Sequence, residues 1–450
     1  MPAASVADPA AGSGWVATRA FGRAVVVCGT LALIAVLTGR FDLVLLATPF
    51  ALGTAVSLAR RPSALPVVRL WAAEESAAEG AGVVGALSIG NADEVRYDVV
   101  VARLRPNPWL RLRDTDRPHA ATVRPGRAAD LPLHGRALRW GRHPVGPAVV
   151  HGVASDGLLV TAPLVASGVP VKVYPVTEPF DAPEAMPRAA GLIGVHRSRR
   201  PGEGGELAGV RVFSPGDRLR RIDWRISLRT QQLHVASTLS DRDAEVVLLL
   251  DVLHEAGRSG GVDGTPSVLD TTVRAAAGIA EHYLKRGDRV SMVEYSAAPR
   301  RVRAGSGRRH YLTILEWLLD VAPGASFAEP GSGAFGPHLL SPNALVIVLT
   351  PLLDTRSAGM LAQIARSGRF VVAVDTLTGV SDGADPSAAA DEGSRWLPLA
   401  RRLWLLERDN LVGELREHGV PVVAWAGAGS LDLVLRDVAR MAAGPKGALR

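Results

Sequence analysis

The stretch EVVLLLDV, residues 245–252, is a continuous apolar run that ends at an acidic residue. An amphipathic segment, VLDTTVRAAAGIAEHYLKRG at 268–287, follows it, and a second apolar run, RVSMVEYS at 289–296, comes next. Apolar strands that alternate with amphipathic helices are typical of a parallel sheet covered by helices on both faces. We therefore predict an α/β, doubly wound domain over residues 241–450.

The same alternation continues toward the end of the chain. We expect further helices and strands in seven stretches: RHYLTILEWLLDVA, NALVIVLT, GMLAQIARSG, RFVVAVDT, LVGELREHG, VPVVAWAG and LDLVLRDVARMAA. A Gly-, Ser- and Asp-rich stretch at 379–394 reads as a flexible insertion. No internal repeat is visible.

A different rhythm precedes this domain. Residues 62–176 carry short alternating runs such as YDVVVARLR and LLVTAPLV, separated by Gly, Pro, Asn and Asp. This pattern is typical of an antiparallel β-sandwich. Residues 177–240 begin Pro-rich, turn basic, and contain a distinctive motif, so we interpret them as a linker and motif segment.

Two apolar runs near the N-terminus predict a transmembrane helical hairpin over residues 23–61. The runs are 24–39 and 43–59, with Arg40, Phe41 and Asp42 as the polar break. Each run is close to the minimum of roughly 17 residues for a span. A signal peptide is the alternative, which the second run and the Arg60-Arg61 pair disfavour.

Basic residues flank the hairpin on both outer sides: Arg19, Arg23, Arg60, Arg61 and Arg69. The positive-inside rule then places residues 1–22 in the cytoplasm as a tail, together with everything after the hairpin. We expect a two-span protein of the cell membrane whose soluble domains are cytoplasmic.

The bulk composition agrees with a folded, multidomain chain. Its 450 residues exceed what one core supports, and 47% are apolar. The net charge of +7 is spread along the chain, which suits an anionic membrane surface, an acidic partner or nucleic acid. Cys28 is the single cysteine, so neither an intrachain disulfide nor a thiolate metal site can form.

Asp251 lies at the carboxyl end of a predicted strand, where ligand sites of open α/β sheets are found. In von Willebrand factor A-like domains this position carries Asp-x-Ser-x-Ser and binds a divalent cation. Here both serines are replaced, Glu255 is a possible oxygen donor, and the acid expected directly after the strand VIVLT is Pro351, with Asp354 following. A hard cation needs about six oxygens, so we interpret the region around Asp251, Glu255 and Asp354 as a degenerate site without metal.

Ser259 lies in a Gly-x-Ser-x-Gly stretch, the pattern of a hydrolase nucleophile elbow. Asp354 or Asp375 and then His418 follow in suitable chain order. However, an elbow turns directly from strand to helix, and the predicted helix begins only near Val268. A serine hydrolase is therefore the alternative function rather than the main one. The Gly-x-Gly-x-x-Gly stretch at 331–336 precedes a strand and does not predict dinucleotide binding.

The motif segment holds RVFSPGDRLRRIDWRISLRTQQLHV, residues 211–235. Pro215 and Gly216 predict a turn, Asp217 a helix cap, and the recurring arginines a short helix with a basic stripe. In this interpretation Ile222 and Leu228 are available for burial. Trp224 packs on the sheet, and Asp223 pairs with an arginine. The segment is then either a structural clasp or a docking surface for an acidic partner; nucleic acid is disfavoured because only one aromatic residue is interleaved.

This motif resembles the hallmark of the bacterial family catalogued as domain of unknown function fifty-eight. The matching residues are Pro215, Gly216, Asp217, Arg220, Ile222, Asp223, Trp224, Arg229, Leu233 and Val235. Arg218 departs from the family pattern, which often has a second aspartate there. The layout of anchor, β-rich segment, motif and von Willebrand factor A-like domain also agrees.

The resemblance implies a non-enzymatic membrane scaffold or adaptor without a cofactor. Members are commonly encoded beside a MoxR-type AAA+ ATPase and sometimes a transglutaminase-like membrane protein, which implies a role in complex assembly or envelope-related maturation. On this basis we expect Arg220, Arg225 and Arg229 to contribute to docking, and Asp223 and Trp224 to hold the local geometry.

Overall fold

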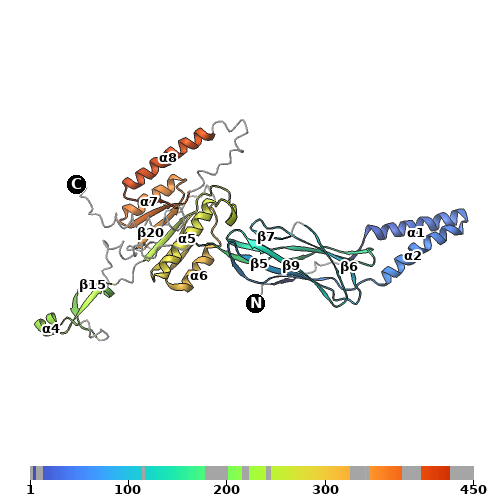
Figure 1. Ribbon diagram of the computed structural model, residues 1–450, viewed down its shortest axis with the longest axis horizontal. Coiled ribbons are helices and arrows are strands. Elements are labelled where there is room, and N and C mark those ends of the chain that lie inside the picture. Colours follow the sequence, from blue (N-terminus) through green and yellow to red (C-terminus); the bar gives the residue numbers. More distant parts are fainter. Residues whose placement is uncertain are drawn as a thin grey trace. The chain divides into compact units, whose positions relative to one another are not determined.

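The computed structural model describes residues 4–6, 14–113, 117–177, 201–214, 222–239, 245–324, 340, 344–377 and 397–425. The chain divides into two compact units, Met1–Tyr174 and Pro175–Arg450 (Figure 1). The first unit holds the two apolar helices and a β-sandwich. The second holds a two-stranded hairpin and an α/β sheet.

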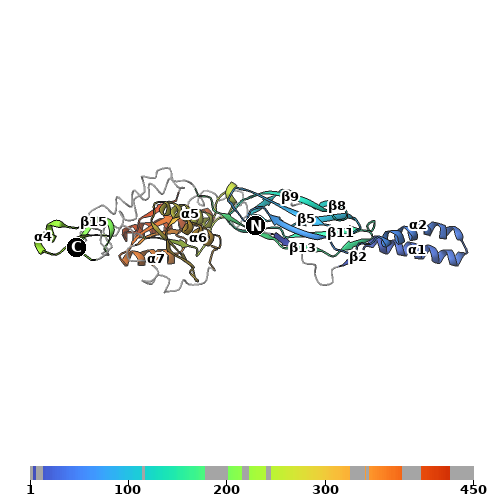
Figure 2. The same cartoon turned by 90° about the horizontal axis from the view of Figure 1, so that it is seen from below.

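The two apolar runs form helices α1, Arg19–Thr38, and α2, Phe41–Ala59. They lie side by side (Figure 2). Gly39, with a φ of 66°, ends α1 in the left-handed region that glycine tolerates best. The connection between the helices differs from the predicted break of Arg40, Phe41 and Asp42. Phe41 and Asp42 belong to α2, and only Gly39 and Arg40 lie between the helices.

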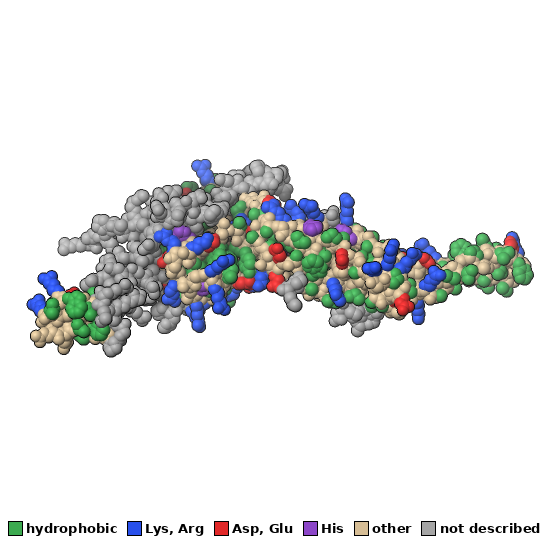
Figure 3. Space-filling view, turned by 60° about the horizontal axis from the view of Figure 1, so that its bottom comes forward, with side chains coloured by type: hydrophobic (Ala, Val, Ile, Leu, Met, Phe, Trp, Pro, Cys, Tyr) green, Lys and Arg blue, Asp and Glu red, His purple; other side chains and the backbone are tan. Residues whose placement is uncertain are grey.

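Both helices are long and apolar enough to cross a membrane. Their apolar side chains face outward: Val36 is 80% exposed, Leu37 75% and Phe41 85%. Figure 3 shows the hairpin covered largely by hydrophobic side chains. Exposing so much apolar surface to water is unfavourable, which is consistent with a lipid environment.

The β-rich segment is a sandwich, as the alternating pattern predicts. Its strands after the hairpin are β3 Val67–Ala72, β4 Ser76–Ala78, β5 Gly82–Gly90, β6 Tyr97–Leu104, β7 Leu110–Leu112, β8 His119–Val123, β9 Ala128–Ala137, β10 Gly141–Val145, β11 Ala148–Ala154, β12 Leu159–Thr161, β13 Leu164–Ala166 and β14 Val169–Tyr174. Three sheets form, with orders β1-β3-β5-β9-β7, β10-β14-β4 and β2-β12-β11-β6-β8, and β13 pairs with β11.

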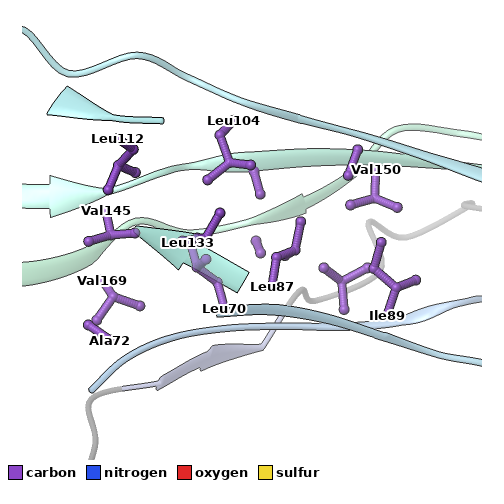
Figure 4. Packing of buried hydrophobic residues seen from close by; sticks show 14 of the residues in the cluster. Leu70, Ala72, Leu87, Ile89, Leu104, Leu112, Leu133, Val145, Val150 and Val169 are labelled. Carbon is purple, nitrogen blue, oxygen red and sulfur yellow. The ribbon is translucent and has the colours of Figure 1, made fainter. Parts of the chain in front are cut away.

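The sandwich core lies between these sheets (Figure 4). Leu70 and Leu87, from β3 and β5, are fully buried. They share one apolar cluster with Leu104 of β6 and Val150 of β11. Alternate residues of each strand point into this core, which is why the sequence shows a period of two.

The first residues of the chain belong to the sandwich rather than to a separate tail. Strand β1, Ala4–Val6, pairs with β3, and strand β2, Trp15–Ala17, pairs with β12. The expected tail at 1–22 is thus corrected: strands precede the hairpin, and α1 already begins at Arg19. Sequence reasoning missed them because three-residue edge strands carry almost no periodic signal.

A β-hairpin occupies part of the expected linker segment. Strand β15, Pro201–Val212, pairs antiparallel with β16, His234–Leu239. Between them lies helix α4, Trp224–Thr230. The motif therefore lies in a connection between two paired strands, and the Pro-rich part at 178–200 lies outside the described residues.

The α/β sheet has the order β19-β18-β17-β20-β21-β22. Its strands are β17 Glu245–Asp251, β18 Arg289–Tyr295, β19 Arg301–Gly305, β20 Ala344–Thr350, β21 Phe370–Asp375 and β22 Val422–Ala424. Its helices are the 3-10 turn η3 Gly261–Asp263, α5 Val268–Lys285, α6 Gly307–Leu318, α7 Thr355–Arg366 and α8 Leu397–Glu417. Figure 1 shows α5 and α6 on one side of this sheet and α7 and α8 on the other.

The predicted strands and helices that fall on described residues of this unit are confirmed, and the structure adds strand β19 and the part of α8 that precedes Leu411. Strand β19 pairs antiparallel with β18 at the edge, so the sheet is mixed rather than wholly parallel. Its sequence, RVRAG, alternates arginines with Val302 and Ala304, and such an edge strand is not expected to show the apolar run of a central one. The insertion at 379–394 and the last predicted helix, at 431–443, lie outside the described residues.

Candidate functional site

Helix α4 is held in place by two polar residues of the motif segment. The carboxylate of Asp223 accepts a hydrogen bond from the Ile226 N–H at 3.1 Å, which caps the helix. The Ser227 hydroxyl donates to the Asp223 carbonyl at 2.6 Å and accepts from the His234 N–H at 2.8 Å. Ser227 thereby ties α4 to β16, and Ile222 forms a bridge with Val235 beside it.

The outward face of α4 is both apolar and basic. Trp224 is 62% exposed and Leu228 78% exposed. They are four residues apart and so form one ridge, while Arg225 and Arg229, also exposed, form a second. We call these four residues the α4 surface.

These positions correct one expectation about the motif. Trp224 and Leu228 face outward instead of packing or being buried, because the helix directs Ser227 inward, where it is 6% exposed. Asp223 caps the helix N-terminus, and its pairing with an arginine stays a prediction, since Arg220 and Arg221 lie outside the described residues.

Part of the motif cannot be placed. Pro215, Gly216, Asp217 and Arg220 lie outside the described residues, and so does the cap expected at Asp217. The cap that the structure describes for α4 is Asp223. The basic stripe is therefore observed only at Arg225 and Arg229.

A second polar cluster surrounds Asp251 at the carboxyl end of β17. The Thr350 and Ser357 hydroxyls each donate to Oδ2 of Asp251 at 2.6 Å, and the Leu253 N–H donates to Oδ1 at 3.2 Å. Asp251 is 3% exposed, and this burial raises the pKa of its carboxyl group. The three hydrogen bonds act in the opposite direction and lower the pKa, but burial is the larger effect. The carboxylate thus joins β17, β20 and the first turn of α7.

Asp354 makes its own, separate set of contacts. It caps α7 through the Arg356 N–H at 2.8 Å and accepts from the Arg356 side chain at 2.5 Å. His254 Nε2 lies 2.8 Å from the same carboxylate oxygen. The Arg356 guanidinium is the main cause that holds the pKa of Asp354 well below its usual range.

These contacts bear on the expected degenerate metal site. Asp251 and Asp354 each satisfy their carboxylates with protein donors, while Glu255 is exposed. Within the described ranges no cluster of three His, Cys, Asp or Glu side chains is placed to hold a metal ion. The interpretation of this region as a site without metal stays a prediction.

Sequence reasoning did not single out four of the residues in this cluster: Thr350, Ser357, His254 and Arg356. The sequence holds only part of the information that would identify these four residues. Thr350 ends an apolar strand, and Ser357 lies in the first turn of a helix that starts after a capping Asp. Pairing them with Asp251 requires knowing that β17 and β20 are neighbours, although about 100 residues separate them.

The residues of the hydrolase alternative are not brought together by any described contact. The Ser259 hydroxyl accepts from the Gly261 N–H at 3.2 Å, in the loop that precedes α5 instead of at a direct turn from strand to helix. Asp375 pairs with Arg408 at 2.6 Å, and His418 Nδ1 lies 2.7 Å from the Glu414 carbonyl. The Gly-rich stretch at 331–336 lies outside the described residues.

A family model described as "Protein of unknown function DUF58" matches residues 209–383. This segment is therefore similar to the DUF58 family. It runs from β15 through α4 and β16 into the α/β sheet, so both polar clusters lie inside it. The resemblance carried by the motif is thereby confirmed, and the family description itself states no function.

Three curated proteins share part of the sequence. Uncharacterized proteins Rv1480 of Mycobacterium tuberculosis H37Rv, MT1527 of Mycobacterium tuberculosis CDC 1551 and Mb1516 of Mycobacterium bovis are each 35% identical over 131 residues. The match covers 28% of this chain and 39% of each relative. The chain thus matches about two fifths of their length.

One similar solved structure is a GH20 exo beta-N-acetylglucosaminidase from Vibrio harveyi in complex with N-acetylglucosamine. It is 10% identical and covers 78% of this chain and 74% of its own, with a TM-score of 0.16. An inactive D437A mutant of the same enzyme gives the same values. Scores this low carry no conclusion about fold or activity.

Proposed function

We propose that this chain is a non-enzymatic, membrane-anchored scaffold that docks a MoxR-type AAA+ ATPase or its client through the α4 surface. The observation that carries the proposal is the exposure of Trp224 and Leu228 beside Arg225 and Arg229 within the DUF58 segment. Tryptophan and arginine are the side chains that most often dominate the energetics of protein interfaces. A basic ridge favours an acidic partner surface.

Between the two roles considered for the motif, docking is the better supported. A clasp needs the large apolar side chains of α4 to pack against the rest of the protein. Instead, the helix is attached by Ser227 and its cap, and the large side chains stay available. The choice of a MoxR-type ATPase rests on the family resemblance alone. A transglutaminase-like membrane protein is a further partner on the same basis.

We interpret the α/β sheet as a von Willebrand factor A-like domain without metal or cofactor. Its strand order, with one antiparallel edge strand beside β18, supports this interpretation. So does the position of Asp251 at the carboxyl end of the central strand β17. In place of a cation, the hydroxyls of Thr350 and Ser357 satisfy this carboxylate.

The anchor in this proposal is the α1–α2 hairpin. The exposed apolar surface of both helices supports insertion in a membrane. The basic residues that flank the hairpin favour cytoplasmic soluble units, which gives them access to a cytosolic ATPase.

The proposal is tested by capturing the MoxR-type ATPase from detergent-solubilised membranes with the full-length protein. Replacing Arg225 and Arg229 by Glu should weaken capture by about tenfold or more, since interfacial charge reversals commonly cost this much. The melting temperature should not change, because both side chains are exposed.

A matched control replaces Arg308 and Arg309 by Glu. These arginines are also exposed but lie on α6. The control should capture the ATPase as the unmodified protein does. Equal loss in both variants, or loss that follows a lower melting temperature, contradicts docking through the α4 surface.

A further inference from the structure

The register of the sandwich brings three connections to one end. Val67 pairs with Gly90, and Gly90 pairs with Ala128. Tyr97 pairs with Val123 in the facing sheet. The connections 60–66, 91–96 and 124–127 therefore meet at the same end as the C-terminus of α2.

The turn between β11 and β12 joins them at this end. Thr18, which precedes α1, donates its backbone N–H to the Leu158 carbonyl at 2.9 Å and its hydroxyl to the Gly157 carbonyl at 2.7 Å. Ser57 of α2 donates to Asp156 at 2.6 Å. We call this end, where both helices attach, the helix-side end.

Exposed arginines gather at the helix-side end. They come from α1 and from three connections: Arg19, Arg23, Arg60, Arg61, Arg96, Arg124 and Arg127. Figure 3 shows Lys and Arg side chains close to where the apolar hairpin joins the sandwich. These side chains lie on several separate loops, so their common position is a product of the fold.

The acidic residues at this end are largely engaged by the protein. Asp93 accepts from the backbone N–H groups of Ser63 and Ala64, and Asp98 accepts from that of Gly157. Asp156 accepts from Ser57, and Glu94 is exposed. The seven arginines outnumber these four acidic residues, so the described part of this end carries an excess of positive charge.

The opposite end of the hairpin has no such excess. There Arg40 pairs with Asp42 at 2.6 Å, which leaves the tip balanced in charge. The tip of the hairpin, which carries no net charge, is suited to crossing the apolar layer of a membrane. The helix-side end, which is basic, is suited to staying at an anionic membrane surface.

We propose that the helix-side end of the sandwich binds the anionic phospholipid headgroups around the hairpin, with Arg96, Arg124 and Arg127 as contacts that belong to the sandwich itself. The proposal rests on the membrane insertion of α1 and α2. Guanidinium groups bind phosphate in a bidentate manner, and each arginine near an anionic surface strengthens attachment by a factor of about five. The sandwich then contacts the bilayer surface directly, in addition to its covalent connection to α1 and α2.

The test reconstitutes the full-length protein in lipid nanodiscs of phosphatidylcholine, with or without phosphatidylglycerol. Hydrogen exchange of the amides in 92–96 and 124–127 should slow by about fivefold or more when phosphatidylglycerol is present. High salt should remove the effect, because exposed charges are screened. Replacing Arg124 and Arg127 by Glu should abolish it.

A matched control replaces Arg105 and Arg111 by Glu at the far end of the sandwich, where both are exposed. This control should keep the full response to phosphatidylglycerol. Identical exchange in both lipid mixtures, or equal loss in the control, overturns the proposal.

Carbonate extraction separates this outcome from a failure of membrane insertion. The Arg124 and Arg127 variant should remain in the membrane pellet, since the hairpin is unchanged. A chain that is extracted by carbonate contradicts the anchor itself, and with it the scaffold proposal.

Discussion

The side chain of Asp251 connects three elements of the α/β unit: β17, β20 and α7. Its carboxylate is buried and reaches β20 through Thr350 and α7 through Ser357. A buried carboxylate is tolerated only when such donors replace water. The site at the end of β17 thus has a structural role whether or not it ever binds an ion.

Replacing Ser357 by Ala should lower the free energy of unfolding of the α/β unit by about 1–3 kcal/mol, because it leaves a buried acceptor with one donor fewer. Chemical denaturation measures this free energy, and hydrogen exchange of the β17 amides shows whether the change lies in the α/β unit. Ser306→Ala is the control: Ser306 is exposed and its side chain caps no helix, so its replacement should be close to neutral. Equal effects of the two variants would contradict this role.

Asp354 makes a pH-dependent contribution whose sign follows from its contacts. Its folded pKa is lowered, mainly by the Arg356 side chain, so the ionised form stabilises the folded state. This stabilisation is complete above the unfolded pKa of about 3.9 and is lost as the pH falls below it.

Replacing Asp354 by Asn should therefore destabilise the unit by about 1–3 kcal/mol at neutral pH. The difference from the unmodified protein should shrink as the pH falls below about 4. Urea unfolding at a series of pH values measures both quantities. A difference that stays constant across this range would show that charge is not the cause.

At the scale of elements, α4 is a seven-residue helix that depends on its cap and on Ser227. Helices this short are unstable alone in water. Its sequence indicated a helix with an arginine stripe, but not which side faces outward. The bond of Ser227 to β16 decides that, and it exposes Trp224 and Leu228.

Replacing Asp223 by Ala should destabilise α4 by about 1 kcal/mol, which speeds hydrogen exchange of the Ile226 to Thr230 amides by about fivefold. Asp223→Asn should leave exchange nearly unchanged, since asparagine caps as well as aspartate does. If both variants exchange equally fast, the charge of Asp223 matters more than its cap.

At the scale of the whole molecule, strands on both sides of the hairpin belong to one sandwich. Trp15, before α1, donates its indole N–H to the Ala64 carbonyl, after α2, at 3.1 Å. Its ring also packs on Tyr97, with ring centroids 5.5 Å apart. The two ends of the hairpin must therefore lie on the same side of any membrane that it crosses.

Reporter fusions at the N- and C-termini should consequently both report the cytoplasm: a fluorescent reporter should be active and a phosphatase reporter silent. The basic flanks favour the cytoplasmic side, and the pairing of β2 with β12 requires that Trp15–Ala17 and Leu159–Thr161 lie on the same side. A phosphatase active at either terminus would overturn the cytoplasmic assignment and exclude a cytosolic ATPase partner.

Segments whose side chains repeat with a clear period could be predicted from the amino-acid sequence. The apolar runs fixed α1 and α2, the alternation fixed the sandwich, and runs such as EVVLLLDV fixed the central strands of the α/β sheet. The motif around Ile222, Asp223 and Trp224 also identified the DUF58 segment. In each case one segment carries the whole signal, because burial on one or both faces dictates its pattern.

Contacts between residues that are distant in the chain could not be predicted in this way. The tertiary structure added β1 and β2 to the sandwich, placed Thr350 and Ser357 on Asp251, and gathered Arg96, Arg124 and Arg127 beside the hairpin. These contacts join segments far apart in the chain, and their residues follow no local period. They depend on strand order and register, which the packing of the complete core sets.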